Sequence, residues 1–179
     1  EIKTTLSSKK SVFNLIGQYS INDNNNLNFD LYNKIDREKE NPLDLKLTLD
    51  FEEYFEINFL NYIKNKGDIL NLKIDLLKKK SDLKINQFQI NEGKNSFILN
   101  DAKFSNGNFL SFDKLLVKTY KNGKTNNDFK ITFNQNIDIK GQQLDASNFP
   151  KILKRQSGKN ILSKISKNIE INMRSEEHT

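Results

Sequence analysis

The sequence predicts a mainly β protein, an antiparallel meander of about ten strands with one short helix near residues 149–155. Two observations support this fold class. Apolar and polar residues alternate over most of the chain, as they do in strands with one buried and one solvated face. The segments between these stretches have the length and composition of hairpin turns, and no helical crossovers of the kind that parallel sheets need are visible.

The clearest strand of the N-terminal part spans residues 43–51. From Asp44 onwards every second residue is apolar, and the residues between are polar or charged. Two strands are predicted before it, at 12–20 and 27–35, and Gly17 is a candidate bulge in the first. The apolar positions of the third strand are Leu45, Leu47, Leu49 and Phe51.

The segment 52–64 is ambiguous. Phe55, Ile57 and Phe59 alternate as in a strand, whereas other apolar residues of this segment have the spacing of a helical face. We favour a strand, because residues 65–68 (NKGD) then form a hairpin turn into the next strand. That next strand is predicted at 69–77, with the apolar positions Leu70, Leu72, Ile74 and Leu76.

The apolar phase changes within the strand predicted at 83–90. Leu83 and Ile85 are odd-numbered, whereas Phe88 and Ile90 are even-numbered. One extra residue near Asn86 and Gln87 produces such a slip, which is typical of a β-bulge.

Three further strands complete the meander. Two are predicted at 96–105 and 108–120, with Asn106-Gly107 between them, and Asn122-Gly123 predicts a tight hairpin turn after the second. The third spans 129–140 and keeps one apolar phase at Phe129, Ile131, Phe133, Ile137 and Ile139.

The pattern changes after residue 140. Phe149, Ile152 and Leu153 have helical spacing, and Pro150 suits a first helical turn, so a short helix is expected at 149–155. A strand at 169–173 follows. Residues 174–179 (RSEEHT) match the translation of a common sequencing adaptor, and we expect them to be a scar and not part of the fold; the alternative is a natural polar tail.

The composition argues against most kinds of catalytic or metal chemistry. The chain has no cysteine, and its one histidine, His178, lies in the suspected scar, so no catalytic residue, cofactor-binding residue or metal ligand is predicted. The formal net charge is +6, but the lysines are spread out among acidic residues, which does not favour nucleic-acid binding. We therefore predict a non-enzymatic protein.

Few helices are available to cover the apolar faces of the strands. Three solutions are open from the pattern alone: a sandwich, a closed barrel, or a groove that another molecule fills. A fragment of an outer-membrane barrel is a third hypothesis, after the two given below. Its strands need about nine to eleven residues and flanking aromatic girdles, whereas many strands here span about seven to nine residues and no girdle is visible.

The string NIDIKGQQLDASNFPKIL, residues 136–153, resembles a hallmark of AsmA-like envelope proteins, in particular the YhdP-type branch. In that family a strand runs into a Gly-x-x-Leu/Phe-Asp turn and then a short helix-like segment, and Gly141, Leu144 and Asp145 occupy those places here. The strand rhythm of 70–140 is also similar. The resemblance covers about half to two-thirds of the chain.

The resemblance implies an open, curved and twisted β-groove with an apolar interior. Residues 1–173 are then a fragment of a larger periplasmic β-groove domain, in a protein anchored in the inner membrane of the Gram-negative cell envelope by segments outside this fragment. The implied role is to conduct phospholipid between the inner and outer membranes, with phospholipid acyl chains as partners and no cofactor. The alternative is a structural or adhesive β-rich surface domain.

The candidate groove-lining residues are the apolar positions of three predicted strands. They are Leu45, Leu47, Leu49, Phe51, Leu70, Leu72, Ile74, Leu76, Phe129, Ile131, Phe133, Ile137 and Ile139.

Overall fold

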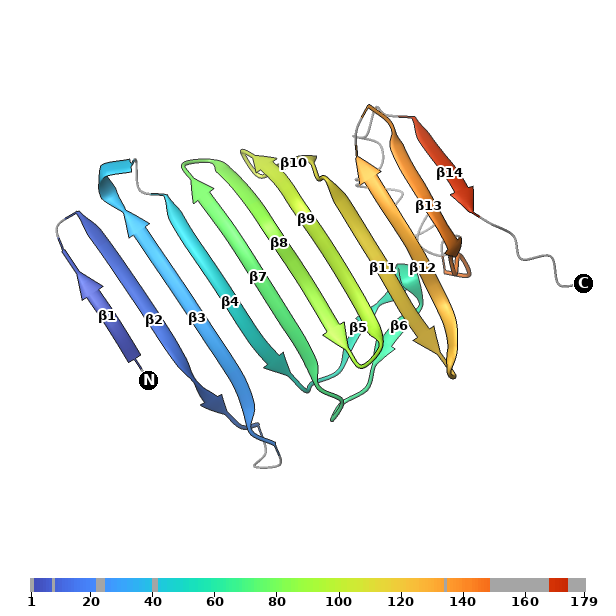
Figure 1. Ribbon diagram of the computed structural model, residues 1–179, viewed down its shortest axis with the longest axis horizontal. Coiled ribbons are helices and arrows are strands. Elements are labelled where there is room, and N and C mark those ends of the chain that lie inside the picture. The colour runs from blue at the N-terminus through green and yellow to red at the C-terminus, as the bar shows by residue number, and fades with distance from the viewer. Residues whose placement is uncertain are drawn as a thin grey trace, which may run out of the picture.

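The computed structural model of the chain describes residues 2–7, 9–21, 25–39, 42–133, 135–148 and 168–173 (Figure 1). Its first strands are β1 (Ile2–Leu6), β2 (Lys10–Tyr19), β3 (Leu27–Asp36), β4 (Leu43–Phe51), β5 (Phe55–Ile57), β6 (Tyr62–Lys64) and β7 (Leu70–Lys79). The remaining strands are β8 (Asp82–Glu92), β9 (Asn95–Ser105), β10 (Asn108–Ser111), β11 (Lys114–Lys121), β12 (Lys124–Phe133), β13 (Ile137–Gln143) and β14 (Ile169–Met173). Two short 3-10 segments are η1 (Arg37–Lys39) and η2 (Asn58–Leu60).

One large open sheet dominates the described residues. Twelve strands belong to it, in the order β1-β2-β3-β4-β7-β8-β9-β11-β12-β13-β14, with β10 paired to β9. The sheet is not closed into a barrel, and Figure 1 shows β1 at one edge and β14 at the other. The prediction of a mainly β, open antiparallel meander is confirmed. The pairing of β13 with β14 is the exception, because it is parallel.

The predicted strand at 52–64 is wrong. β4 pairs directly with β7, with Phe51 opposite Leu70, so the chain between them leaves the sheet. It forms its own hairpin, in which β5 pairs with β6 and η2 makes the bend. The alternating and helical signals of this segment overlapped because two three-residue strands flank a helical turn.

Two other predicted strands are each divided. The stretch 108–120 is β10 followed by β11, and both lie along β9, with a break at Phe112 and Asp113. The stretch 129–140 contains the end of β12 and the start of β13, which face one another with Phe133 opposite Ile137. Because those two residues are an even number apart and share a face, the turn did not disturb the apolar phase.

The phase slip predicted near Asn86 is confirmed, and it continues into the next strands. Asp75 and Leu76 of β7 face Gln87 and Ile85 of β8, which leaves Asn86 as the extra residue. The facing position of β9 is Asp101, whose φ of 53° is left-handed. Together with the break between β10 and β11, these irregularities keep neighbouring strands in register with one another.

Gly17 is not a bulge. It pairs with Phe29 in regular β2–β3 register. A Cβ at Gly17 would lie 3.0 Å from Cζ of Phe29, so the missing side chain makes room for that ring. The helix predicted at 149–155 and the suspected scar at 174–179 lie outside the described residues, whereas the strand predicted at 169–173 is present as β14.

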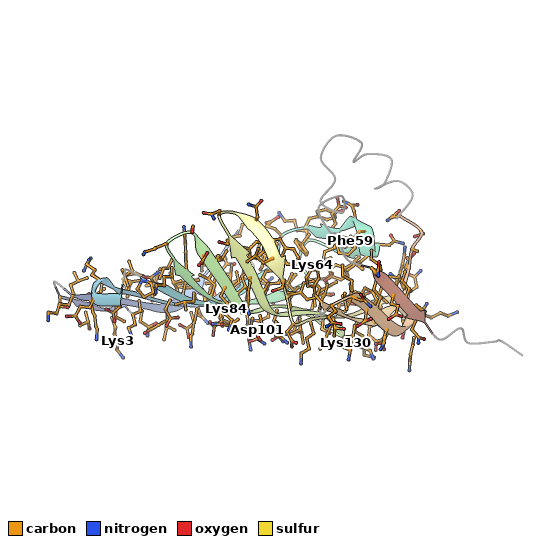
Figure 2. The ribbon with its side chains drawn as sticks, turned by 90° about the horizontal axis from the view of Figure 1, so that it is seen from above. Lys3, Phe59, Lys64, Lys84, Asp101 and Lys130 are labelled. Atoms are coloured by element: carbon orange, nitrogen blue, oxygen red, sulfur yellow. The ribbon has the colours of Figure 1, made fainter. Side chains whose placement is uncertain are left out.

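The buried core lies between the main sheet and the β5–η2–β6 hairpin. Leu60 and Tyr62 of the hairpin pack against buried residues of five main-sheet strands. Those residues are Leu70, Ile90, Phe97, Val117 and Phe129. Figure 2 shows the hairpin, with Phe59 and Lys64, on one side of the sheet, and Lys3 and Lys130 on the other.

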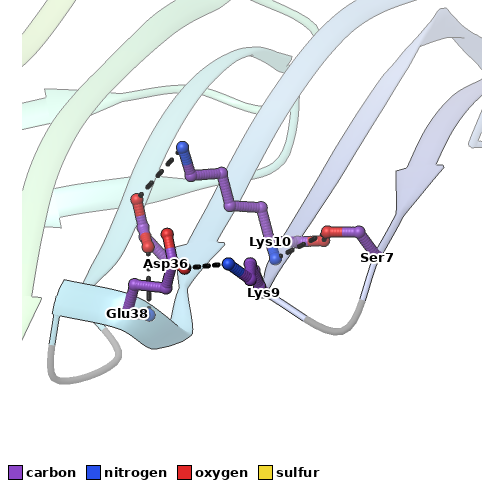
Figure 3. Close-up of polar contacts among 5 residues, drawn as sticks. All are labelled: Ser7, Lys9, Lys10, Asp36 and Glu38. Atoms are coloured by element: carbon purple, nitrogen blue, oxygen red, sulfur yellow. Dashed lines mark hydrogen bonds and ion pairs between the residues drawn. The ribbon is translucent and has the colours of Figure 1, made fainter.

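Polar contacts fasten the turn between β1 and β2 to η1 (Figure 3). Lys9 Nζ lies 2.8 Å from Glu38 Oε1, and Lys10 Nζ lies 3.8 Å from Asp36 Oδ2. The Lys10 backbone N–H donates to Ser7 Oγ at 2.8 Å, which closes the turn itself. Because most of these side chains are exposed, each ion pair stabilises the fold by less than about 1 kcal/mol.

The left-handed backbone of Asp101 generates a prediction for stability. Asp101→Val should lower the free energy of unfolding by about 1–2 kcal/mol, because a β-branched residue is strained at positive φ. Asp101→Gly should not show this loss, since glycine adopts positive φ freely and the ion pair that Asp101 makes with Lys84 is exposed. Urea denaturation measures both, with Lys103→Val as the same-strand control. Equal losses for the two valine variants would contradict the bulge at Asp101.

Candidate functional site

One row of apolar side chains crosses the main sheet from edge to edge. Residues directly opposite one another on paired strands point to the same face. Following these pairs from β1 to β14 gives one apolar residue on each of eleven strands, about 48 Å at a strand spacing of about 4.8 Å. This apolar row consists of Ile2, Leu15, Leu31, Leu47, Ile74, Phe88, Leu99, Leu115, Ile131, Ile139 and Ile171.

The thirteen candidate groove-lining residues all lie on the face that carries this row, called the apolar face from here on. Pairs such as Leu45 with Leu76 and Phe51 with Leu70 join β4 to β7 there, and Phe133 with Ile137 joins β12 to β13. The neighbouring row on the other face, the polar face, is almost entirely polar or charged. It consists of Lys3, Asn14, Tyr32, Lys46, Asp75, Gln87, Asn100, Lys114, Thr132, Asp138 and Glu170.

The hairpin covers only part of the apolar face. The buried cluster beneath it draws on strands β7 to β9, β11 and β12. Leu31, Leu45 and Leu47 are half-buried and belong to neither this cluster nor the side chains packed against it. The apolar face therefore remains partly accessible over β3 and β4.

A buried amide holds the hairpin on the sheet. Asn127 of β12 is fully buried, and its Nδ2 donates to the Leu60 carbonyl at 2.9 Å and to Thr119 Oγ1 at 2.8 Å. Its Oδ1 accepts the backbone N–H of Asp145 at 2.8 Å. One side chain thus connects the hairpin, two strands of the sheet and the segment after β13.

Asp145 also joins the hairpin to the segment after β13. Asn61 at the hairpin bend donates Nδ2 to Asp145 Oδ2 at 2.8 Å, and Ser147 donates its backbone N–H to Oδ1 at 3.0 Å and its hydroxyl to Oδ1 at 2.5 Å. These hydrogen bonds, led by those from Ser147 and Asn61, hold the pKa of Asp145 at about 2. We call Asn61, Thr119, Asn127, Asp145 and Ser147 the clasp.

The three residues that carried the family resemblance have structural roles beside this clasp. Gly141 faces Phe129 at an irregularity of the β12–β13 pairing, where a Cβ would lie 2.3 Å from the Asp128 carbonyl oxygen. Leu144 packs against the buried cluster, and Asp145 belongs to the clasp. The motif therefore positions the chain that leaves β13 against the hairpin.

Two side chains of β6 are buried against the sheet and also hold the hairpin there. Lys64 is 1% exposed, and its Nζ donates to the carbonyls of Glu53 at 2.8 Å and Asn65 at 3.0 Å. Burial lowers the pKa of Lys64. The Tyr62 hydroxyl donates to Glu92 Oε2 at 3.2 Å, and burial, followed by the charge of Glu92, raises the pKa of Tyr62.

Sequence reasoning named Asp145 through the family motif, but it missed Lys64 and the clasp residues Asn61, Thr119 and Asn127. A signal was present for the clasp: Thr119 and Asn127 interrupt apolar series at positions in phase with Val117 and Phe129. Polar residues at a core-facing position indicate a buried hydrogen-bond partner. Lys64 offered no such signal, because one lysine at the end of an ambiguous segment resembles any exposed lysine.

No group of three or more His, Cys, Asp or Glu side chains among the described residues is arranged to hold a metal ion. A depression of about 370 Å³ lies on the polar face, over Ile98, Leu116, Lys118 and Lys130, and is separate from the apolar face. Within the described ranges, no helix has the length and apolar character to cross a membrane.

Comparison of the chain with protein-family models, curated proteins and solved structures found no match. The resemblance to AsmA-like proteins therefore stays a prediction, supported only by the residues that carry it.

The clasp generates a prediction for stability. Asn127→Ala should lower the free energy of unfolding by about 2–4 kcal/mol, because the Leu60 carbonyl and the Asp145 N–H each lose a buried partner at about 1–3 kcal/mol. Asn126→Ala is the matched control, since Asn126 reaches the same carbonyl at 3.3 Å from a half-buried position and should cost less than about 1 kcal/mol. Urea denaturation distinguishes the two, and similar losses would show that the buried amide is not the main anchor.

Asp145 generates a prediction for pH dependence. Its folded pKa of about 2 lies below the usual aspartate pKa of 3.8, so the stability that its charge contributes is complete above about pH 4 and is lost as the pH falls towards about 2. Asp145→Asn should flatten the dependence of the urea midpoint on pH in this window. Ser147→Ala should move the loss to higher pH, because the carboxylate loses a hydrogen bond. An unchanged profile in both variants would contradict this assignment.

Proposed function

We propose that this chain binds phospholipid acyl chains on its apolar face, as a segment of a protein that conducts phospholipid between the inner and outer membranes. The observation that carries the proposal is the unbroken apolar row over eleven strands. The accompanying location is the one that the resemblance implies, the periplasm, with anchorage in the inner membrane through segments outside this chain.

The physical argument starts from what covers an apolar sheet face. Domains bury such a face under a second layer, and contiguous apolar patches above a few hundred Å² are rare on monomers without a binding role. Among the described residues the second layer is one hairpin, and Leu31, Leu45 and Leu47 are only half-buried. Acyl chains are suitable partners, because each CH₂ that leaves water gains about 0.8 kcal/mol.

We expect lipid to move along the same apolar row. Side chains in the row are Leu, Ile or Phe on every strand, with no polar residue among them. Contacts of this kind are non-directional, so neighbouring accessible positions such as Leu31 and Leu47 bind an acyl chain about equally well, and a chain passes between them without breaking a specific polar contact. The headgroup remains in water. The proposed activity is binding and passage, and it includes no catalytic step, cofactor or nucleic acid.

In the alternative, a structural or adhesive surface domain, protein and not lipid would cover the apolar face. A second large sheet stacked about 10 Å away would favour it. Besides the main sheet, the described residues contain only the two-stranded β5–β6 sheet. No specific observation therefore favours this alternative.

Tryptophan quenching tests the proposal. The chain has no tryptophan, so Leu47→Trp places a single reporter in the apolar row and Thr48→Trp places the matched control on the polar face. The probe is a brominated short-chain phosphatidylcholine below its critical micelle concentration, because bromine quenches tryptophan only at close range. We expect saturable quenching at position 47 and little at position 48.

Two outcomes would overturn lipid binding. One is equal quenching at both positions, which indicates non-specific association. The other is no quenching at position 47 while circular dichroism shows an intact sheet. Mass spectrometry of lipid that copurifies with the unmodified chain is an independent measurement.

A further inference from the structure

One charged side chain interrupts the apolar face near the strand ends that lie farthest from the hairpin. Cross-strand pairs define a row of residues there, which we call the rim row. It consists of Ser11, Ile35, Leu43, Lys78, Leu83, Phe104 and Phe109. Lys78 is the only charged member of this row. It lies directly opposite Leu43 of β4 and Leu83 of β8, so it has apolar neighbours on both sides.

Lys78 continues the apolar series of β7. Side chains two residues apart on a strand point to the same face, so Lys78 shares the apolar face with Leu76 and Ile74. Its side chain is exposed, and within the described ranges it takes part in no ion pair. The lysine stem can lie along apolar side chains while its ammonium group stays in water. This arrangement suits the boundary between an acyl chain and an anionic headgroup.

The opposite ends of the same strands are closed to solvent. Leu27 at the start of β3 is fully buried, and Leu70 at the start of β7 is 3% exposed. At the rim row, by contrast, Ile35 and Leu43 are only half-buried. In Figure 1 the turn between β7 and β8 lies at the end of the sheet away from β5 and β6. A headgroup that stays in water can therefore leave the apolar face at the rim row and not beside the hairpin.

The charges at the two ends favour the same orientation of an anion. At the base of the hairpin the charges of four carboxylates act on Lys64, and Lys66 is the second ammonium group there. The four carboxylates are those of Glu52, Glu53, Asp68 and Glu92. Negative charges therefore outnumber positive ones at this end. The rim row lies about 27 Å away along β4, beyond the Debye length of about 8–10 Å, so each end acts on a headgroup independently.

We propose that Lys78 binds the phosphate group of an anionic phospholipid whose acyl chains lie on the apolar face of β4 and β7. This inference rests on the proposed function, and it specifies the headgroup class and the orientation of the bound lipid. The acyl chains run from Lys78 towards the hairpin and contact Leu45, Leu47 and Ile74. Because an ion pair at an exposed lysine adds little affinity, the preference over a zwitterionic lipid with the same chains is about two- to five-fold.

The position of bromine atoms along the acyl chain tests the orientation. Leu43→Trp places a reporter opposite Lys78, and the Leu47→Trp reporter lies about 14 Å nearer the hairpin. A short-chain phosphatidylglycerol brominated next to its ester groups should quench position 43 more than position 47. The same lipid brominated at its chain ends should shift the ratio towards position 47. Equal ratios for the two probes would overturn the proposed orientation.

A comparison of two headgroups tests the role of Lys78. With Leu47→Trp as reporter, the probes are short-chain phosphatidylglycerol, which is anionic, and phosphatidylcholine, which is zwitterionic, with the same brominated chains and below their critical micelle concentrations. At low ionic strength we expect phosphatidylglycerol to bind about two- to five-fold more tightly. Lys78→Gln should make the two affinities equal, and Lys78→Arg should keep the preference. Lys73→Gln is the matched control, because it removes an exposed lysine from the polar face of the same strand, and it should also keep the preference.

The outcomes separate the headgroup assignment from lipid binding as such. If neither lipid quenches position 47 while circular dichroism shows an intact sheet, lipid binding fails and the headgroup assignment fails with it. If both lipids quench but Lys78→Gln keeps the preference, or Lys73→Gln abolishes it, only the assignment to Lys78 is overturned. Sodium phosphate distinguishes a lipid headgroup from free phosphate. At matched ionic strength it should displace phosphatidylglycerol no better than sodium chloride does, and stronger displacement would overturn a lipid headgroup as the occupant.

Discussion

Register is the constraint on which the rest of this structure depends. A single open sheet has two unlike faces only if every strand places its apolar residues at the same height and on the same side, and a slip by one residue exchanges the faces of a whole strand. Ten consecutive pairings meet this condition along the apolar row. Where β8 gains Asn86, β9 gains Asp101 at the facing position, so the two strands remain in step.

The hairpin between β4 and β7 depends on a different balance. Its apolar residues Leu60 and Tyr62 favour burial on the sheet, yet η2 leaves the backbone carbonyl of Leu60 pointing into that contact. Asn127 of the main sheet donates a hydrogen bond to the Leu60 carbonyl, and Asp145 accepts one from the side chain of Asn61. Burial supplies the free energy of this contact, and the polar groups determine where the hairpin sits.

Much of the fold could be predicted from the sequence because alternation is a local signal. The rhythm from Leu43 to Phe51, the slip near Asn86 and the Asn-Gly turns all follow from neighbouring residues. That residues 52–69 leave the main sheet could not be predicted. Their path depends on the pairing of Phe51 with Leu70, which are separated by 18 residues of chain and are joined only when β4 pairs with β7. The parallel pairing of β14 is non-local for the same reason. Within the candidate site, alternation placed the apolar residues on one face, whereas the partners of Asn127 and Lys64 depended on the hairpin.

The irregularities at Asn86, Asp101 and the β10–β11 break have a consequence for how such a chain can change length. Each extra residue is matched by one in the next strand, so a deletion in β8 alone would put it out of step with β9. The extra residues begin at β8, opposite the bond between Asp75 and Leu76, because β7 itself carries no extra residue. Insertions and deletions along this line are therefore tolerated only as a set, and related chains should gain or lose these residues together across neighbouring strands.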